Sequence, residues 1–276
     1  MKRHKLTTSL VTTYIGFIAT AHASAPQPLF SPEQETRIGE IAADYLVSHP
    51  EILVTVSHKL QEQQEVRKQK MFALSVMENQ ANLLHDPDTP AYGPENAKVA
   101  VIEFFDYQCV FCNRFAPELE KVMKAQPDVR YLFKEWPIFA GRREASLQAA
   151  QQGLTVWQKK GPQAYVTYHN AIYATGHNEG KLTAEDILAA ASKAGLAAPA
   201  PGDHTASLEK NSNLAEELGL TGTPGIIVMP VNGATPETIT VFPEAVTAEK
   251  LQAAIRKAKR FAVLSTAGVH NFPDNL

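Results

Sequence analysis

The segment VAVIEFFDYQCVFCNRFAPEL, residues 99–119, constrains the fold of this chain more than any other. It begins with a near-continuous apolar run of strand length, which is typical of a buried strand. Residues 113–125 then place apolar side chains at helical spacing, and VRYLFKEWPI predicts a second strand. A strand, a helix and a strand at this spacing form a βαβ unit with parallel strands and a right-handed crossover. The pattern therefore predicts an α/β fold.

The two cysteines of the chain, Cys109 and Cys112, lie between this strand and this helix. Cys109 is expected at or near the N-cap, where unpaired N–H groups and the helix dipole favour the thiolate. The two-residue gap lets the two sulfurs approach bonding distance within one helical turn. We expect Cys109 to be the exposed, attacking thiol and Cys112 the shielded, resolving thiol of a disulfide exchange through a mixed disulfide.

Three other roles remain open for the cysteine pair. A structural zinc site needs four ligands, but the chain has no further cysteine and its nine histidines include no pair at zinc-binding spacing. Two thiolates can hold Cu(I), so weak copper binding at Cys109 and Cys112 is a secondary property to consider. A structural disulfide is the third role, although so short a loop constrains little chain entropy.

The first 23 residues resemble a secretory signal peptide. MKRHK is positively charged, a mostly apolar segment follows, and Ala21-His22-Ala23 offers small residues where a signal peptidase cleaves. An uncleaved anchor is the alternative, but the segment is short for a span of about 20 apolar residues. Export would permit disulfide chemistry. The formal net charge of −3, about −6 after cleavage, gives no indication of a nucleic-acid partner.

Residues 26–85 predict an N-terminal helical region. Ser31 is a suitable N-cap with Pro32 at the first helical position, and His49-Pro50 interrupts the helix. Two short amphipathic helices cannot bury their apolar stripes alone, so they pack on the main domain or on another copy of the chain. We expect self-association, with residues 61–70 as a solvated linker. The stripe residues are Ile38, Ile41, Tyr45 and Leu46, then Leu53, Val56 and Leu60, and again Leu74, Met77 and Leu84.

The Pro- and Gly-rich segment HDPDTPAYGPENAK predicts a boundary loop, so that a main domain covers residues 86–262. Within it, residues 142–219 are expected to be largely helical. TGTPGIIVMP and ETITVFP predict two further strands, and TAEKLQAAIRKAKR a terminal helix capped by Thr247. Residues 263–276 form a tail without a predicted element.

The combination of a strand, FFDYQCVFC and a helix, with TGTP much later before another strand, resembles the thioredoxin superfamily. The helical block between the two halves resembles the DsbA branch of periplasmic disulfide oxidoreductases. The N-terminal extension, the EFFDY approach to the cysteines and TGTPG are most similar to ScsC-type proteins, the suppressor-of-copper-sensitivity disulfide isomerases. The resemblance implies a thioredoxin-like fold with an inserted helical domain (DsbA-like), preceded by an N-terminal helical oligomerisation region.

The resemblance also implies roles for individual residues. Cys109 matches the nucleophile and Cys112 the resolving cysteine, Pro224 matches a cis-proline, and the Thr223 backbone pairs with an extended substrate. A trans proline in an ordinary turn is the alternative for Thr223-Pro224. Glu103 matches a buried acid whose raised pKa suits proton transfer to or from Cys112; a strand-edge carboxylate with an arginine partner is the alternative.

The dipeptide Val110-Phe111 between the cysteines is predicted to touch substrate and to tune the thiolate. Apolar side chains supply neither a hydrogen bond nor a positive charge to Cys109. We therefore expect a thiol pKa above the value of about 3.5 in DsbA and closer to about 7 in thioredoxin. Of the aromatic side chains near this turn, Phe111 is expected to be exposed.

The predicted function is that of a periplasmic protein thiol–disulfide oxidoreductase. An isomerase or reductase linked to copper tolerance is favoured over a DsbA-like dithiol oxidase, and a Cu(I)-binding scaffold is the alternative from another class. No cofactor is expected beyond the redox-active Cys109–Cys112 disulfide. The expected partners are unfolded or misfolded exported proteins with cysteines, a membrane reductase or oxidase, and further copies of the chain.

Overall fold

The computed structural model describes residues 29–197 and 201–267. The predicted signal peptide, residues 1–23, and the last nine residues of the predicted tail lie outside the described residues. The chain divides into two compact units, residues 1–60 and 61–276, and the division falls within helix α2 (Glu51–Glu78). Among the described residues, no helix is both long and apolar enough to cross a membrane.

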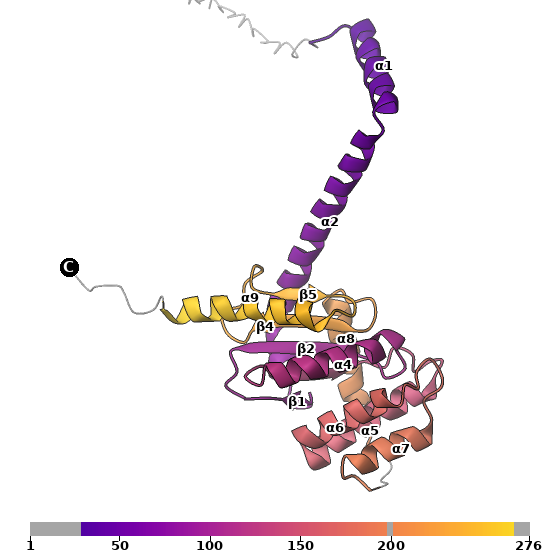
Figure 1. The fold of residues 1–276 in the computed structure, drawn as a ribbon, viewed down its shortest axis with the longest axis vertical. Coiled ribbons are helices and arrows are strands. Elements are labelled where there is room, and N and C mark those ends of the chain that lie inside the picture. The colour runs from indigo at the N-terminus through magenta and orange to yellow at the C-terminus, as the bar shows by residue number, and fades with distance from the viewer. Residues whose placement is uncertain (1–28, 198–200, 268–276) are drawn as a thin grey trace, which may run out of the picture. The chain divides into compact units, whose positions relative to one another are not determined.

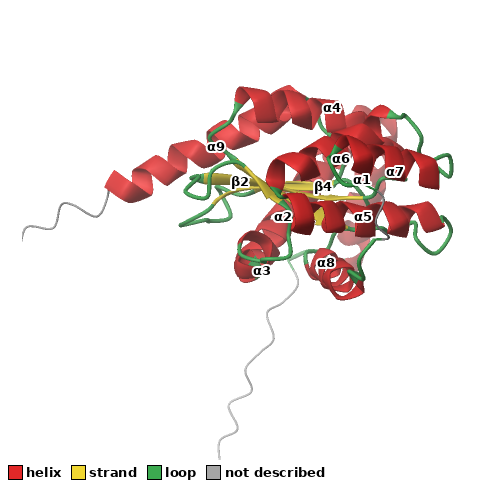
Figure 2. Cartoon of the chain, turned by 90° about the horizontal axis from the view of Figure 1, so that it is seen from below, coloured by secondary structure: helices red, strands yellow, loops and turns green. Residues whose placement is uncertain are grey.

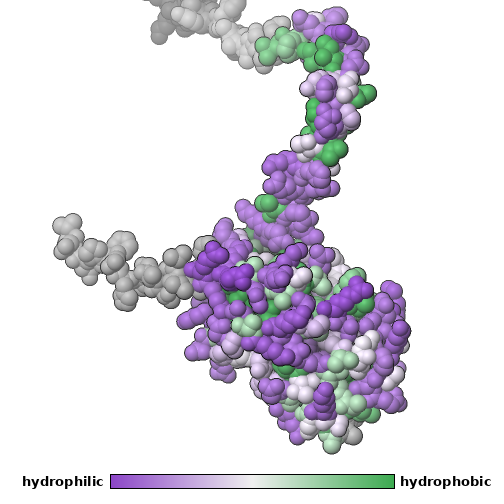
Figure 3. Space-filling view, in the orientation of Figure 1, coloured by the Kyte–Doolittle hydropathy of each residue, from purple (hydrophilic) through white to green (hydrophobic). Residues whose placement is uncertain are grey.

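The first unit contains helix α1 (Pro32–Ser48) and the first residues of α2. The predicted start of α1 is confirmed, because the Ser31 hydroxyl accepts from the Gln34 N–H at 3.3 Å and the Gln34 side chain accepts from the Ser31 N–H at 2.8 Å. The predicted interruption at His49-Pro50 is confirmed as well. No residue of α1 is buried. Figure 3 shows apolar surface on these helices, and the exposed large apolar residues include Ile38, Ile41, Tyr45, Leu53, Val54, Val56 and Leu60.

The second unit is built on a five-stranded mixed sheet of order β1-β3-β2-β4-β5. The predicted βαβ unit is confirmed: β2 (Val99–Phe105) and β3 (Arg130–Glu135) are parallel, and α4 (Val110–Ala125) connects them. The strands β4 (Gly225–Pro230) and β5 (Thr240–Phe242) follow the TGT segment and pair antiparallel, as does the short β1 (Ala91–Tyr92) with β3. Every residue of β2 is buried, as its unbroken apolar pattern predicts.

Helices cover both faces of this sheet. Figure 2 shows α4 and α9 on one side of the strands and α3 and α8 on the other. The predicted helical block is confirmed as four helices in the described residues, of which Figure 1 shows α5, α6 and α7 at one end of the unit. The remaining helix bounds are Gln80–Leu84 for α3, Glu144–Lys160 for α5, Pro162–Ala174 for α6, Ala184–Lys193 for α7, Thr205–Glu217 for α8 and Ala248–Ala267 for α9.

Two predicted boundaries differ from the packing and the helix bounds of the structure. The N-terminal helical region was expected to extend to residue 85, but Phe72, Val76 and Leu83 are buried against the second face of the sheet, with Leu214 of α8. The apolar end of α2 therefore packs on the main domain, whose compact unit begins at Gln61. The tail was expected from residue 263, but α9 continues to Ala267.

A buried ion pair holds α3 and the following loop on the sheet. The ammonium of Lys134, on β3, is fully buried and donates to the Asp86 carboxylate and to the Asn82 carbonyl, each at 3.0 Å. Lys210 on α8 reaches the same carboxylate at 2.8 Å. These contacts lower the pKa of Asp86 to about 2, although burial acts in the opposite direction.

Candidate active site

Cys109 is the N-cap residue of α4, as predicted, with φ −82° and ψ 120°. Its N–H donates to the Asp106 carbonyl at 3.0 Å, which closes the turn between β2 and the helix. The expected exposure of this thiol is wrong: Cys109 is only 4 % exposed. The reason is its contact with the loop before β4, since its Sγ lies 3.2 Å from the carbonyl oxygen of Thr223.

The surroundings of Cys109 favour its thiolate. Its pKa is lowered from 9.0 to about 6, chiefly by a hydrogen bond from the Cys112 thiol, against the opposing effect of burial. Thr223 and the backbone N–H groups of Cys112 and Phe111 add to the lowering. The value lies between the reference values of about 3.5 and about 7 and nearer the second, in agreement with the sequence-based prediction.

Cys112 lies one turn inside α4 and is completely buried, so the predicted shielding is confirmed. Burial raises its pKa well above the usual value, and the negative charges of Cys109 and Glu103 raise it further. Both cysteines are free thiols. At neutral pH one sulfur of the pair is thus ionised and the other is protonated.

The Thr223-Pro224 peptide bond is cis, as the family resemblance implied, and the trans alternative is wrong. It immediately precedes β4, whose pairing with β2 brings it to the active-site turn. The hydroxyl of Thr223 is buried without a hydrogen-bond partner in the described part of the chain. The loop therefore places one carbonyl and one hydroxyl at the edge of the Cys109 site.

Glu103 lies in the middle of β2, opposite Phe133 of β3 and Ile226 of β4. It is 1 % exposed, and neither carboxyl oxygen has a hydrogen-bond partner among the described residues. Burial, followed by the charge of Cys109, raises its pKa to about 8. The predicted buried acid is confirmed, and the alternative of a strand-edge carboxylate with an arginine partner is wrong.

The two residues between the cysteines differ in exposure. Val110 is half-buried, whereas the Phe111 side chain is 54 % exposed, as predicted. The guanidinium of Arg114 lies 5.6 Å from the centre of the Phe111 ring. Tyr107 and Phe115 are core residues. Phe111 is thus the apolar side chain that this turn presents to solvent.

Several polar residues beneath the site were not predicted. Glu135 accepts hydrogen bonds from Tyr107 at 3.1 Å and Tyr165 at 2.8 Å, and burial raises its pKa well above the usual value. His169 of α6 lies near Glu103. The segment YVTYHNAIY carried a signal, because its aromatic residues and its histidine recur at helical spacing. Nothing in that pattern identified the acid that the histidine faces.

The helical insertion also supports the active-site turn. The backbone carbonyl of Gln108, which precedes Cys109, accepts from the Glu179 N–H at 3.0 Å, and its side chain accepts from the Gly180 N–H at 2.6 Å. Both donors belong to the loop between α6 and α7. The residue before the nucleophile is therefore held by the insertion.

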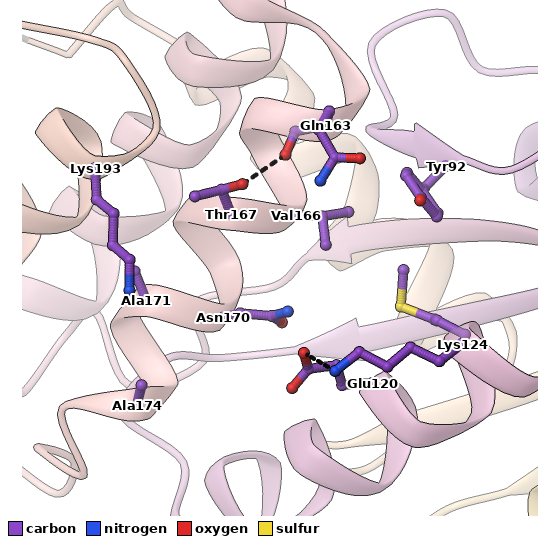
Figure 4. Close-up of a pocket in the computed structure, with 11 residues that line it drawn as sticks. Tyr92, Glu120, Lys124, Gln163, Val166, Thr167, Asn170, Ala171, Ala174 and Lys193 are labelled. Atoms are coloured by element: carbon purple, nitrogen blue, oxygen red, sulfur yellow. Dashed lines mark hydrogen bonds and ion pairs between the residues drawn. The ribbon is translucent and has the colours of Figure 1, made fainter.

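A groove of about 450 Å³ lies between α4 and α6 (Figure 4). Glu120, Asn170 and Ala174 line it and also line a smaller hollow of about 230 Å³, which reaches Asn113 beside Cys112. In the described part of the chain, no three His, Cys, Asp or Glu residues are grouped so that they could hold a metal ion. The site thus consists of two unlike thiols, a buried acid, a cis-proline loop and a neighbouring groove.

Comparison with protein families matches this architecture. A family model described as Thioredoxin matches residues 85–260, more than half of the chain. A second model, described as the copper resistance protein ScsC N-terminal domain, matches residues 34–66. The second match covers most of α1 and the exposed stripe at the beginning of α2.

Solved structures agree with these matches. BcfH of Salmonella enterica Typhimurium is 37 % identical with a TM-score of 0.70, over 82 % of this chain and 96 % of BcfH. Proteus mirabilis ScsC in a transitional conformation is 26 % identical with a TM-score of 0.57, over 84 % of this chain and 98 % of that protein. A periplasmic thioredoxin-like protein from the same Salmonella serovar is 28 % identical with a TM-score of 0.55, over 64 % and 94 %.

A partial similarity to larger curated proteins was also found. The Na⁺/H⁺ antiporter NhaA 1 of Salinispora arenicola is 25 % identical over 150 residues, which are 52 % of this chain and 22 % of the antiporter. NhaA 3 of Salinispora tropica matches to the same extent. The chain thus spans about a fifth of the length of the curated relatives it matches.

Proposed function

Because the chain belongs to the thioredoxin family and carries an ScsC-type N-terminal domain, we propose that it is a periplasmic protein thiol–disulfide oxidoreductase acting through Cys109 and Cys112. The observation that carries this proposal is the opposite shift of the two thiols. The pKa of Cys109 is lowered to about 6 and that of Cys112 is raised well above its usual value. Cys109 is thereby ionised and able to attack, whereas Cys112 stays protonated until the second step.

The chemistry proceeds in two steps. The Cys109 thiolate attacks a disulfide of a client protein, and the electron pair of that bond leaves with the departing client sulfur. Cys112 then loses its proton to Glu103 and attacks Cys109, which releases the second client thiolate and leaves the Cys109–Cys112 disulfide. Two electrons pass to the client, and the reverse sequence oxidises a client dithiol. A membrane reductase or oxidase resets the cysteine pair.

Substrate binding involves the surfaces beside Cys109. The Thr223 backbone before the cis-proline pairs with an extended client segment, and the exposed Phe111 ring, with Val110 beside it, covers an apolar client side chain. These contacts suit unfolded or misfolded exported proteins, since such clients expose both backbone and apolar residues. Release of the mature protein into the periplasm requires cleavage after Ala23.

The first unit supports isomerase action through self-association. Ile38, Ile41 and Tyr45 on α1, and Leu53, Val56 and Leu60 on α2, repeat the same spacing of three and four residues. This spacing is that of a helical seam, and every one of these side chains is exposed in the single chain. A second copy carries the identical stripe, so the occupant we propose is another chain. Several active sites in one oligomer would hold a misfolded client while Cys109 attacks its incorrect disulfide.

Two alternatives remain as outcomes of the test. A DsbA-like dithiol oxidase would use the same cysteines to introduce disulfides. A Cu(I)-binding scaffold would use the two thiolates as ligands. A role in copper tolerance fits the isomerase as well, through repair of disulfides formed by copper oxidation.

The test is reactivation of a protein with scrambled disulfides, together with reduction and oxidation of a small peptide. The mature protein is compared with an Ile41→Glu/Val56→Glu variant, which places charge on both stripes, and with Gln64→Glu, a matched charge at an exposed polar position of α2. Cys109→Ala is the inactive control. Molar mass is measured by light scattering.

We expect an oligomer that reactivates the substrate, and a stripe variant that is monomeric, still exchanges with the peptide and no longer reactivates. Oxidation of the peptide without any reactivation by the mature protein would identify an oxidase. Absence of all exchange, together with Cu(I) binding, would identify the scaffold.

A further inference from the structure

Glu103 and His169 form an enclosed pair directly beneath the cysteines. The distance between Oε2 of Glu103 and Nε2 of His169 is 3.9 Å, and the two side chains are 1 % and 2 % exposed. Within residues 29–197 and 201–267, neither oxygen of Glu103 nor Nε2 of His169 has a hydrogen-bond partner. Ring contacts with His169 are made by Phe105, Tyr107, Phe133, Tyr165 and Tyr173.

The other nitrogen of His169 faces a different environment. Nδ1 lies 3.2 Å from Oδ1 of Asn170. Asn170 is half-buried and lines the groove between α4 and α6 (Figure 4). The imidazole of His169 therefore stands between the enclosed carboxyl of Glu103 and a groove that opens to solvent.

Hydrogen bonding selects one tautomer of this imidazole. Asn170 Oδ1 can only accept, so the proton is on Nδ1 and Nε2 presents its lone pair to Glu103. Burial keeps both partners neutral, because it lowers the pKa of His169 to about 4 and raises that of Glu103 to about 8. A neutral imidazole thus faces a protonated acid.

We propose that His169 is a positioning residue through which Glu103 exchanges its proton with water in the groove between α4 and α6. The proposal rests on the oxidoreductase function proposed above, since it concerns the proton that Cys112 must lose. It assigns a role to α6 of the helical insertion that the thioredoxin-like core does not supply. His169 acts on the reaction only through Glu103.

Glu103 first passes its proton to Nε2 of His169, while the proton on Nδ1 leaves to water beside Asn170. The Glu103 carboxylate then takes the proton of Cys112, which attacks Cys109, and the electron pair of the mixed disulfide leaves with the client sulfur. A shift of about 1 Å brings Glu103 and His169 to hydrogen-bond distance. When the cysteines are reduced again, the transfers run in reverse.

The other titratable groups around this pair are already engaged in hydrogen bonds or held neutral by burial. Asp106 accepts from the Ser146 hydroxyl at 2.7 Å and from the Phe139 N–H at 2.9 Å, and Glu135 accepts from two tyrosines. Of these three acids, only Glu103 has neither oxygen paired. The groups that face the pair are Asp106 and Tyr107 after β2, Glu135 on β3, Cys109 and Cys112 on α4, and Tyr165, Tyr168 and Tyr173 on α6.

The test measures the resolving step separately from the first attack. A fluorescent peptide is joined to Cys109 as a mixed disulfide, and its release by Cys112 is followed by stopped flow between pH 6 and pH 9. The variant is His169→Phe, which keeps an aromatic ring among the five surrounding rings. His204→Phe is the matched control, because His204 is also buried but contacts Thr155.

We expect His169→Phe to slow release about tenfold below pH 8 and to leave the rate of the first attack by Cys109 unchanged. The double variant Glu103→Gln/His169→Phe should release the peptide no more slowly than Glu103→Gln alone, because the two substitutions interrupt the same proton-transfer path. His204→Phe should keep the wild-type pH profile. A wild-type profile in His169→Phe, or multiplied effects in the double variant, would overturn the proposal.

Two further measurements keep the test decisive if His169→Phe does not fold. Asn170→Ala, at a half-buried position, should slow release in the same direction, and a wild-type profile would count against the relay. Nitrogen chemical shifts of His169 in the unmodified protein should report the Nδ1–H tautomer, whereas the Nε2–H tautomer would refute it. Failure of wild-type Cys109 to form any mixed disulfide would refute the oxidoreductase function itself.

Discussion

Replacing Cys112 by alanine should raise the pKa of Cys109. The hydrogen bond from the Cys112 thiol is the largest cause of its low value, with Thr223 and two backbone N–H groups behind it. A hydrogen bond to a charged group contributes about 2 kcal/mol, which corresponds to about 1.5 pH units. The Cys109 midpoint should therefore move from about 6 to roughly 7.5. Cys112→Ser is the matched control, because its hydroxyl still donates.

The same shift sets how the stability of the reduced protein depends on pH. The pKa of Cys109 is lower in the folded than in the unfolded state, so its contribution is complete above the unfolded value of 9.0 and is lost as pH falls through about 6. At pH 7 this contribution is about 1.4 kcal/mol. For a two-electron couple it raises the reduction potential of the disulfide by about 30 mV relative to an unshifted thiol.

The assay must follow the pH midpoint and not a rate at one pH. A rise of about 1.5 units lowers the thiolate fraction at pH 7 about fourfold, but it raises the intrinsic nucleophilicity about fivefold. The two effects nearly cancel in an alkylation rate. Thiolate absorbance near 240 nm, titrated from pH 4 to pH 10, separates them. An unchanged midpoint in Cys112→Ala would show that the helix N-terminus, and not the second thiol, lowers the pKa.

Three further predictions concern other parts of the second unit. Asp86→Ala should lower the free energy of unfolding by about 3 kcal/mol, because the ammonium of Lys134 is left buried without its ion-pair partner. Adding Lys134→Met should restore most of this loss, because methionine removes the buried charge, which burial already disfavours by lowering the pKa of this lysine. Gly153→Ala should lower the free energy of unfolding, measured like that of Asp86→Ala by urea titration, by about 1–3 kcal/mol, because the new Cβ would lie 2.7 Å from Oε1 of Glu135. Phe111→Ala should raise the KM for apolar client peptides several-fold in a peptide-reduction assay and leave the Cys109 midpoint unchanged, because the ring is exposed and gives no hydrogen bond to the thiolate.

Each of these has a clear contrary result. Equal stability of Asp86→Ala and the wild type at pH 7 would mean that Lys134 is not desolvated in solution. A stable Gly153→Ala protein would show that Glu135 can move away from its tyrosine partners. A shifted thiol midpoint in Phe111→Ala would assign this side chain to the electrostatics of the site instead of to client binding.

The sequence predicted those features that depend on local pattern. Val99–Phe105 is apolar without interruption and forms the central buried strand, and the Ser31-Pro32 signal marks the first residue of α1. The cysteines were placed correctly at the start of α4, because the change from strand to helix pattern falls between Phe105 and Asn113. Each of these conclusions needs only neighbours within one turn or one strand.

The errors concern contacts between distant residues. α2 is one continuous helix, so no local signal marks Gln61 as the beginning of the second unit. The burial of Cys109 depends on Thr223, which follows it by 114 residues. The pairing of His169 with Glu103 is of the same kind: either residue alone resembles an ordinary core position, and only the fold brings their unpartnered atoms together.

The difference between the two thiols has two separate physical causes. The pKa of Cys109 is low because several hydrogen-bond donors lie at the first turn of α4. The pKa of Cys112 is high because this thiol is buried one turn deeper, away from solvent. The first cause helps the attack on a client, but it also favours reversal of that attack, because an acidic Cys109 is a good leaving group when the client thiolate attacks the mixed disulfide. An adequate rate of resolution then requires that Cys112 be deprotonated inside the core. In the proposed mechanism Glu103 receives this proton, so interruption of its connection to solvent through His169 should slow the release of the client.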